Sequence, residues 1–378
     1  MQRDPAALKA ALADLEHRDL KRRRRTGVGG LVNFCSNDYL GLKDHPEVVR
    51  AFVDAAAKYG VGSGASHLVT GHGPEHEALE EELAAFTGRE RALVYSTGYM
   101  ANMGVIGALA DQSFTIFSDK LNHASLIDGA RASGADFRRY WHGDVSKVIE
   151  LLMCTQPGSQ LVVTDGVFSM DGDLAPLPDL VEAVGYTNAW LVVDDAHGLG
   201  VVGATGRGCC EYFGLTAKEV PVLVGTFGKA FGTFGAFVAG DADLIEYLMQ
   251  KSRTYIYTTA LPPAVAAATR AALRVSERDS WRREKALSLS KRFQQGLRDR
   301  GLRADGDTPT SIVPVVVGEP ERALTISSKL EDLGFLVTAI RPPTVPKSTA
   351  RLRVTLSAAH EELQVDALLN AFEQAMAV

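Results

Sequence analysis

The chain has 378 residues, of which 46% are hydrophobic and 23% are charged, an ordinary globular composition with enough length for two domains. Its net charge of -6 gives no bulk attraction for nucleic acid, and no apolar run approaches the roughly 20 residues that span a bilayer. The four cysteines form no C-x-x-C pair and the N-terminus has no apolar run of signal-peptide length, so we expect a soluble cytoplasmic protein with free thiols.

Residues 1–45 are expected to form an N-terminal helix and an arm. Leucines recur at helical spacing and predict a helix over residues 5–25, which ends in the basic run from Lys21 to Arg25. Glycines break this helix, and a short strand is expected over residues 31–34.

Residues 46–280 alternate between expected strands and helices and form the predicted large domain. Pro74 opens a helix that Gly88 terminates, and another helix is expected from Gly98 to residue 110. Short strands are predicted over residues 92–95, 161–164, 191–193 and 222–224. The last three are apolar along their whole length, which is typical of strands buried on both faces. The pattern predicts an α/β fold with a mostly parallel sheet and helices on each side.

The remaining residues, 281–378, are predicted to form a smaller α+β domain. A long polar helix over residues 282–297 marks its boundary. The strands and the final helix expected after it cover residues 311–317, 335–339, 352–356 and 361–375.

A lysine follows the expected strand over residues 222–224, in the sequence Thr226-Phe227-Gly228-Lys229. An isolated Gly-Lys pair is typical of a surface loop, but lysine is rarely buried without a purpose. Here Thr226 offers a hydroxyl, and Gly228 lets the backbone approach a phosphate.

Two acids and a histidine follow another strand, in the sequence Asp194-Asp195-Ala196-His197. This is the edge at which open α/β sheets bind ligands. Pyridoxal phosphate needs a lysine for its Schiff base and a carboxylate at its pyridine nitrogen, which makes the ring an electron sink. An acid and a lysine at neighbouring strand ends supply both groups and predict this cofactor on Lys229. Helix capping would explain the two acids equally well, and the pattern does not separate Asp194 from Asp195.

The glycine pattern at residues 198–203 matches the dinucleotide-binding G-x-G-x-x-G. That site requires a helix directly after the glycines and an acid at the end of the next strand. Gly206 and Gly208 interrupt any helix here, and no such acid follows, so we do not expect NAD.

Two further features suit an aromatic phosphate and a third suits a carboxylate, although each is also common as a plain fold element. Ser96-Thr97-Gly98-Tyr99 precedes a helix whose first amides could hold a phosphate. His123 could stack on a pyridine ring. Arg341 lies in a stiff proline frame and could bind a carboxylate. No metal site is predicted.

Taken together, these motifs resemble the α-oxoamine synthase family. The resemblance runs from Ser36 to Arg353, and its strongest motifs are Asn37 to Gly41, Gly166 to Gly172, Asp194 to Gly198 and Thr226 to Lys229. It implies a pyridoxal-phosphate enzyme of fold-type I, the aspartate aminotransferase fold, which condenses an amino acid with an acyl thioester and releases CO2. Members work as homodimers with active sites at the interface.

The resemblance also implies residue roles. Lys229 holds the cofactor and then removes the Cα proton, while Asp194 pairs with the ring nitrogen. His123 stacks on the ring, and His197 and Ser169 lie at the ring hydroxyl. The implied phosphate residues are Gly98, Tyr99 and Thr226, with Thr258 and Thr259 from across the dimer, and the implied substrate residues are Arg341, Asn37, Thr344 and, near the acyl chain, Arg22.

Within the family, Arg341 to Pro346 and Thr349 to Arg353 resemble the branch that makes a biotin precursor from L-alanine and a pimeloyl thioester, on acyl carrier protein or on CoA. A glycine is expected before Thr349, where Ser348 stands. Glycine C-acetyltransferase is the alternative within the family. A non-catalytic cofactor-binding homologue is disfavoured because every chemical role is filled. The basic run from Lys21 to Arg25 is either a docking site for an acidic carrier protein or a solvated helix end.

Overall fold

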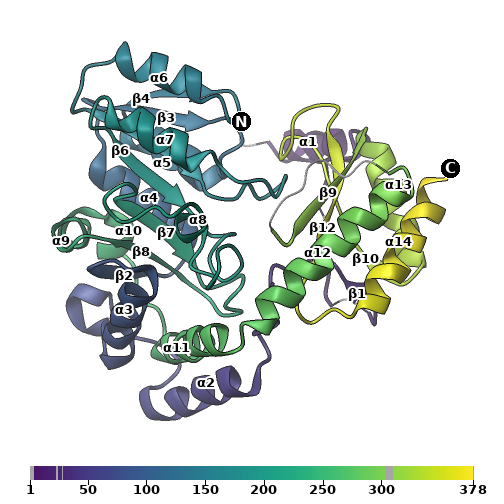
Figure 1. Ribbon diagram of the computed structural model, residues 1–378, viewed down its shortest axis with the longest axis horizontal. Coiled ribbons are helices and arrows are strands. Elements are labelled where there is room, and N and C mark those ends of the chain that lie inside the picture. The colour runs from purple at the N-terminus through teal and green to yellow at the C-terminus, as the bar shows by residue number, and fades with distance from the viewer. Residues whose placement is uncertain (1–3, 23, 28, 303–309, 378) are drawn as a thin grey trace.

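The computed structural model describes residues 4–22, 24–27, 29–302 and 310–377. The described residues form a large unit built on a seven-stranded sheet and a smaller unit built on a three-stranded sheet, which lie side by side (Figure 1). The predicted boundary at residue 280 falls between two consecutive helices, α11 (Pro263–Arg278) and α12 (Trp281–Asp299).

The larger sheet has the strand order β2-β8-β7-β6-β5-β3-β4. Strand β8 runs opposite to the other six strands of this sheet, which all point the same way, so the prediction of a mostly parallel sheet is confirmed. The bounds of its strands are β2 (Arg91–Tyr95), β3 (Thr115–Asp119), β4 (Asp136–Tyr140), β5 (Gln160–Asp165), β6 (Trp190–Asp194), β7 (Val222–Thr226) and β8 (Ala236–Gly240).

Both faces of this sheet are buried, as the apolar strands predicted. In β6, Leu191 and Val193 belong to one hydrophobic cluster, whereas Val192 points to the other face and belongs to a second cluster. This alternation follows from the two-residue period of a strand. The helices and the single π-helical turn that cover or flank the sheet are α2 (Pro46–Tyr59), η1 (His67–Gly71), α3 (Pro74–Thr87), α4 (Gly98–Leu109), α5 (Ala124–Ser133), α6 (Val145–Met153), α7 (Leu177–Gly185), α8 (Cys209–Phe213), α9 (Ala242–Lys251), α10 (Arg253–Ile256) and α11.

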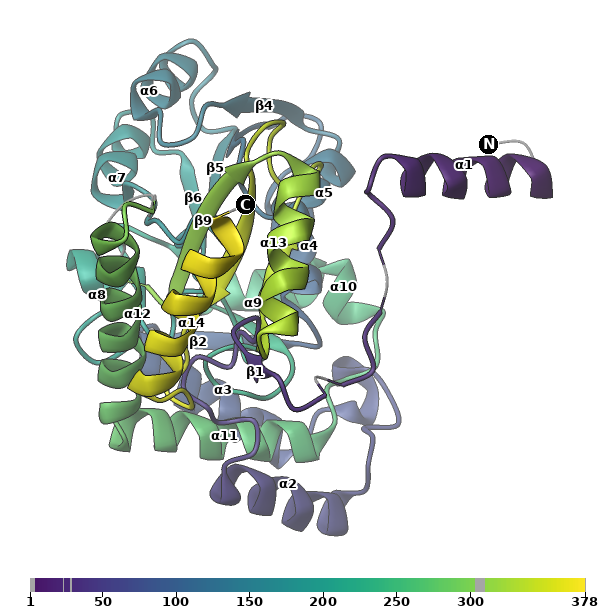
Figure 2. The same cartoon turned by 90° about the vertical axis from the view of Figure 1, so that its right-hand side faces the viewer.

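The helix predicted over residues 5–25 is too long. Helix α1 (Pro5–His17) ends early, and Asp19 adopts a left-handed conformation with φ of 53°. The run from Lys21 to Arg25 would place like charges on adjacent turns of a continued helix, which is destabilising. Figure 2 shows α1 projecting from the body, and none of its residues, all of them described, is buried.

The smaller unit contains β9 (Ile312–Gly318), β11 (Thr338–Ile340) and β12 (Ala350–Thr355), in the order β11-β12-β9. The strand predicted over residues 335–339 is split. Its first part, β10 (Phe335–Leu336), pairs instead with β1 (Val32–Asn33) of the N-terminal arm. Val337 separates β10 from β11 and is buried in the core. The helices of this unit are α12, α13 (Pro320–Asp332) and α14 (Glu362–Met376).

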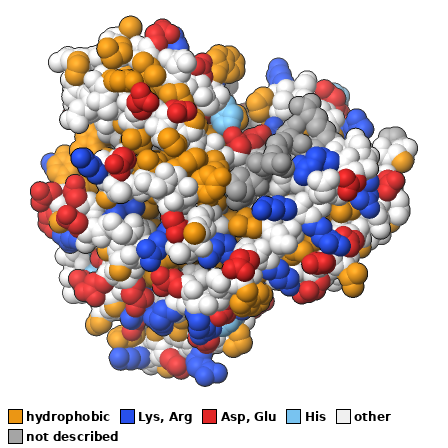
Figure 3. Space-filling view, in the orientation of Figure 1, with side chains coloured by type: hydrophobic (Ala, Val, Ile, Leu, Met, Phe, Trp, Pro, Cys, Tyr) orange, Lys and Arg blue, Asp and Glu red, His pale blue; other side chains and the backbone are white. Residues whose placement is uncertain are grey.

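Charged side chains of both signs are interspersed over the face drawn in Figure 3. Among the described helices, none is long and apolar enough to cross a membrane.

Candidate active site

A cavity of about 190 Å³ lies at the carboxyl ends of β5, β6 and β7. Parallel strands that end at one edge bring polar residues from distant parts of the chain together there. Eight of the residues predicted from the sequence line this cavity: Gly98, Tyr99, His123, Ser169, Asp194, His197, Thr226 and Lys229.

Lys229 is positioned by a tight turn that follows β7. Phe227 N donates to Gly235 O at 2.9 Å, and Thr233 N donates to Phe227 O at 2.9 Å. Gly232 has φ of 66°, and a Cβ there would lie 2.4 Å from Lys43 N, so only glycine fits. Burial lowers the pKa of Lys229 to about 8, although the negative charges of Asp194 and Asp165 act to raise it. The amine is therefore neutral and nucleophilic in a larger share near pH 8 than an ordinary lysine would be.

Asp194 ends β6 and points into the cavity. Its Oδ1 accepts from Ala196 N at 3.0 Å, and its Oδ2 accepts from Asn102 Nδ2 at 2.6 Å. Asn102 lies on α4 and is 1% exposed, so α4 fixes the orientation of this carboxylate. The arrangement suits a carboxylate that must meet the ring nitrogen of a pyridine.

Asp195 follows at once but points away from the cavity. Its Oδ2 accepts from Cys209 N at 2.7 Å, and the residue is 0% exposed. A Cβ on Gly198 would lie 2.0 Å from its Oδ1, so the glycine turn closes around this carboxyl. The geometry separates the two acids, which the sequence pattern left equivalent.

His197 follows β6 and lines the cavity. Its Nδ1 is 2.6 Å from the hydroxyl of Tyr39. Burial, with help from the charges of Lys229 and Arg353, holds the pKa of His197 well below its usual range. The imidazole is therefore neutral at physiological pH and has one ring nitrogen free to act at a hydroxyl.

His123 caps α5 at the mouth of the cavity. Its Nδ1 lies 2.7 Å from Ser125 Oγ, and its backbone N donates to Asp165 Oδ2 at 2.9 Å. Burial of the imidazole lowers the pKa of His123. Burial and then the nearby Asp194 raise the pKa of Asp165 well above its usual range. A neutral imidazole with its ring open to the cavity suits stacking on an aromatic ligand.

The opposite end of the cavity begins at the N-terminus of α4. The first amides of this helix, at Gly98 and Tyr99, have no partner within the helix. The hydroxyl of Thr226 donates to Gly235 O at 2.9 Å and accepts from Gly228 N at 3.4 Å. Free amides and the positive end of the helix dipole are typical of a phosphate site.

Six other predicted residues lie outside this cavity. Asn37 Oδ1 accepts from Arg353 Nη1 at 3.1 Å, and Arg22 Nη2 donates to Thr344 Oγ1 at 3.5 Å. Arg341 donates to the carbonyl of Asp19 and is held against the N-terminal segment. Thr258 and Thr259 precede α11, and Ser96 Oγ donates to Thr259 O at 3.3 Å.

Thr344 lines a second cleft of about 680 Å³, which shares His123 and Ser169 with the smaller cavity. Its walls include the apolar side chains of Phe168 and Met170. Charged residues of both signs also line it: the cations are Lys120, Arg131 and Arg139, and the acids are Asp128 and Asp171.

Two arginines of β12 attach the smaller unit to the wall of the cavity. Arg353 Nε donates to Ser169 O at 2.6 Å. Arg351 Nη1 donates to Met170 O at 3.2 Å and pairs with Asp171. These bonds fix the hairpin over residues 166–175 that carries Ser169.

Several residues around the cavity were not predicted from the sequence. The single bond from Asn102 to Asp194 joins positions 92 residues apart. The other residues that the sequence analysis missed are Tyr39, Ser125, Asp165 and Arg353. Tyr39 and Arg353 lie within motifs quoted above, so the motifs located them but did not indicate their contacts.

The basic run near the N-terminus is already paired in part. Lys21 Nζ donates to Glu16 Oε2 at 2.9 Å, and Arg25 forms an ion pair with Glu331. Arg23, which belongs to the same run, lies outside the described residues.

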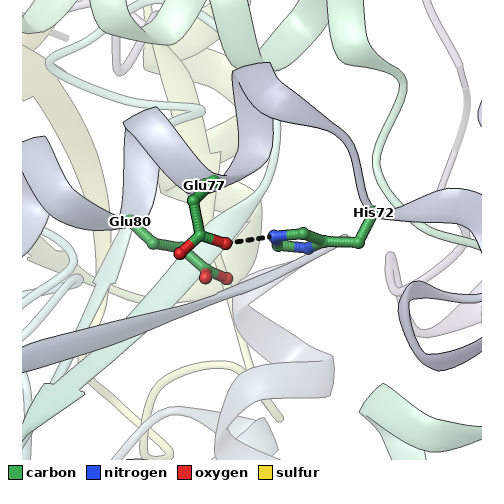
Figure 4. A group of neighbouring side chains, drawn as sticks. All are labelled: His72, Glu77 and Glu80. Carbon is green, nitrogen blue, oxygen red and sulfur yellow. Dashed lines mark hydrogen bonds and ion pairs between the residues drawn. The ribbon is translucent and has the colours of Figure 1, made fainter.

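One group among the described residues could hold a metal ion, at a distance from the cavity. His72, Glu77 and Glu80 offer ligand atoms within 4.8 Å of one another (Figure 4). His72 Nε2 lies 3.1 Å from Glu77 Oε2, and Glu80 Oε1 accepts from Val94 N at 2.8 Å. Burial raises the pKa of Glu80 to about 8, so a proton on this carboxyl relieves the repulsion between the two acids without a metal.

A family model and the most similar curated proteins point to the same family. The family model of class I and II aminotransferases matches residues 30–372. The chain is 57% identical over 384 residues to an 8-amino-7-oxononanoate synthase of Methylococcus capsulatus, covering 99% of this chain and 98% of the relative. It is 54% identical over 378 residues to the enzyme of the same name from Pseudomonas putida strain GB-1, covering 97% and 96%.

Solved structures with the same fold are also similar. A serine palmitoyltransferase from S. paucimobilis with bound PLP–myriocin has a TM-score of 0.92 at 31% identity, covering 99% of this chain and 98% of that one. An 8-amino-7-oxononanoate synthase from Francisella tularensis has a TM-score of 0.80 at 31% identity, covering 91% and 97%.

Proposed function

Because this chain belongs to the class I and II aminotransferase family, of fold-type I, and to the 8-amino-7-oxononanoate synthases within it, we propose that it joins L-alanine to a pimeloyl thioester with loss of CO2. It is a pyridoxal-phosphate enzyme of biotin biosynthesis. The observation that carries the proposal is the convergence of an amine of lowered pKa, Lys229, with the carboxylate of Asp194 in one small cavity.

The residues of the cavity fit this cofactor group by group. Pyridoxal phosphate, when bound, supplies an electron sink beside the amino acid. Lys229 would be the point of attachment and then the base that takes the Cα proton of L-alanine. Asp194 would keep the ring nitrogen protonated, and His123 would stack on the ring. His197 and Ser169 would hold the ring hydroxyl, and Gly98, Tyr99 and Thr226 would receive the phosphate.

The larger cleft is suited to the acyl donor. It adjoins the cavity at β5, β6 and β7, with which it shares His123 and Ser169, and its apolar wall matches an acyl chain. The cationic side chains of Lys120, Arg131 and Arg139 match an anionic end of the donor, whether it is carried on CoA or on acyl carrier protein.

We assign Arg341, Asn37 and Thr344 to the substrate carboxylate and Arg22 to the acyl substrate. Arg22 and Thr344 already lie in contact. For Arg341 the assignment requires that its guanidinium leave the carbonyl of Asp19 when substrate binds.

We propose that the enzyme is a homodimer with shared active sites. Thr258 and Thr259 lie outside the cavity of their own chain, as residues that complete the site of a partner would. Nearby apolar side chains are highly exposed, with exposed fractions of 88% for Val61, 73% for Val69 and 72% for Tyr257. Large exposed apolar groups that gather together are typical of an interface.

The purified protein should bind pyridoxal phosphate, absorb visible light, and change its spectrum most with L-alanine among L-alanine, glycine and L-serine. Pimeloyl-CoA should then give 8-amino-7-oxononanoate and CO2. Lys229→Ala should abolish turnover, whereas Lys218→Ala, at an exposed position, should not change it. A protein whose spectrum changes most with glycine and that turns over acetyl-CoA instead would be a glycine C-acetyltransferase. A protein that stays colourless after addition of the cofactor would refute the proposal.

A further inference from the structure

A histidine outside the cofactor cavity joins two of the segments that form its wall. His142 follows β4, and its Nδ1 lies 3.2 Å from Oδ2 of Asp119 while its Nε2 lies 2.8 Å from Oδ2 of Asp173. Its ring packs edge-on against Phe168, with the ring centroids 4.3 Å apart. Asp119 ends β3, whereas Asp173 lies in the hairpin over residues 166–175, so this one side chain bridges two separate segments.

Asp119 controls the turn that carries His123. It ends β3 and is 2% exposed. Its carboxylate accepts from Leu121 N at 2.7 Å and from Gly143 N at 3.0 Å. The first of these bonds shapes the turn that reaches His123 two residues later. A displacement of this carboxylate would therefore move the backbone of His123.

Asp173 belongs to the hairpin over residues 166–175 that carries Ser169. The hairpin is closed by the bridge between Val167 and Leu174 and by the bond from Phe168 N to Asp173 O at 3.0 Å. Oδ1 of Asp173 is buried and has no hydrogen-bond partner among the described residues. Among the described residues, the bond to His142 is therefore the one that ties the carboxylate of Asp173 to the protein.

The positive charge of His142 lets its ring donate a hydrogen bond to each of the two carboxylates. Burial alone would lower the pKa of His142, but the hydrogen bonds to Asp119 and Asp173 outweigh it and raise the pKa to about 10. At neutral pH both ring nitrogens therefore carry protons, and each donates to one carboxylate. A neutral imidazole could donate to only one of them.

We propose that His142 is a positioning residue, which holds the turn of His123 and the hairpin of Ser169 at the separation that bound pyridoxal phosphate requires. His142 does not line the cavity, so it acts through these two segments and does not touch the cofactor. The inference rests on the proposed function, because it takes His123 and Ser169 as cofactor residues.

The test compares His142→Asn with His17→Asn, a matched change at an exposed position. The affinity for pyridoxal phosphate is measured by equilibrium dialysis, and the orientation of its ring by visible circular dichroism. Urea unfolding of the cofactor-free protein reports stability. Loss of one hydrogen bond between charged groups should weaken cofactor binding roughly tenfold or more in His142→Asn and alter the dichroism band. His17→Asn should match the wild type in all three measurements.

A double-mutant cycle examines the bridge itself. Asp173→Asn should weaken cofactor binding in the same direction, and the double variant should lose less than the sum of the two single losses, because both break one connection. Strict additivity would overturn the proposal. So would wild-type cofactor affinity and dichroism in His142→Asn, even if its stability in urea fell, since histidine would then serve folding alone. A wild-type protein that fails to bind the cofactor would instead refute the proposed function.

Discussion

The bond from Asn102 to Asp194 offers a direct test of how the cavity is built. Asn102→Ala removes a donor that lies 2.6 Å from Asp194 Oδ2 and also contacts Ser125 Oγ at 2.8 Å. A hydrogen bond to a charged group contributes about 1.5–3 kcal/mol. In the cofactor-free protein water can replace part of this loss at the carboxylate, whereas a bound cofactor would exclude that water. The loss should therefore appear mainly in cofactor binding.

We expect the affinity of Asn102→Ala for pyridoxal phosphate to fall roughly tenfold to a hundredfold, with a smaller change in the urea midpoint of the cofactor-free protein. Fluorescence titration with the cofactor measures the first quantity, and tryptophan emission in urea the second. Asn370→Ala is the matched control, because Asn370 is exposed and bonds only to the distant Arg300 among the described residues. Cofactor affinity within about twofold of wild type would refute the reasoning.

Three further outcomes follow from the same geometry. Uptake of pyridoxal phosphate by the cofactor-free protein should quicken as pH rises to about 8 and then level off, because only the neutral amine of Lys229 reacts; stopped-flow absorbance measures this, and a rise continuing to pH 10 would contradict the lowered pKa. Gly198→Ala should lower the free energy of unfolding in urea by about 3 kcal/mol or prevent folding, because its Cβ would lie 2.0 Å from the buried Asp195 Oδ1. Tyr39→Phe should shift the visible spectrum of the bound cofactor, because His197 loses its contact with the hydroxyl at 2.6 Å. The same change should lower the free energy of unfolding by about 1 kcal/mol. An unchanged spectrum would exclude that coupling.

Local patterns predicted much of the fold because they reflect short-range physics. Pro74 and Gly88 mark the ends of α3 because proline fits the first helical turn and Gly88 adopts φ of 65° at the cap. The continuous apolar strands predicted a sheet covered on both faces. The length of α1 and the break at Val337 were mispredicted, since repulsion along a basic run and a change of strand partner depend on context beyond the local period.

The candidate site was predictable where a residue follows a strand or belongs to a recognised motif, as Lys229 and Asp194 do. Residues that act through tertiary contacts had no such signal. The ring of His142 meets Asp119 and Asp173 from 23 and 31 residues away, and no spacing rule connects these positions. The folded chain gives the physical difference between the two acids, since Asp194 faces the cavity and Asp195 is enclosed by glycines.

The arginines of β12 make the protein difficult to divide. A fragment that ends before residue 310 would retain the seven-stranded sheet with Lys229 and Asp194, and so every group that reacts with the cofactor. It would lack Arg351, which bonds to Met170 and Asp171, and Arg353, which bonds to Ser169. It would also lack the hydroxyl of Thr310, which donates to Gly172 O at 2.8 Å. The hairpin beside the cofactor would then lose its outer support. Changes near the end of the chain should consequently impair the cavity as severely as changes within it, and expression of the larger unit alone should not yield a working half-enzyme.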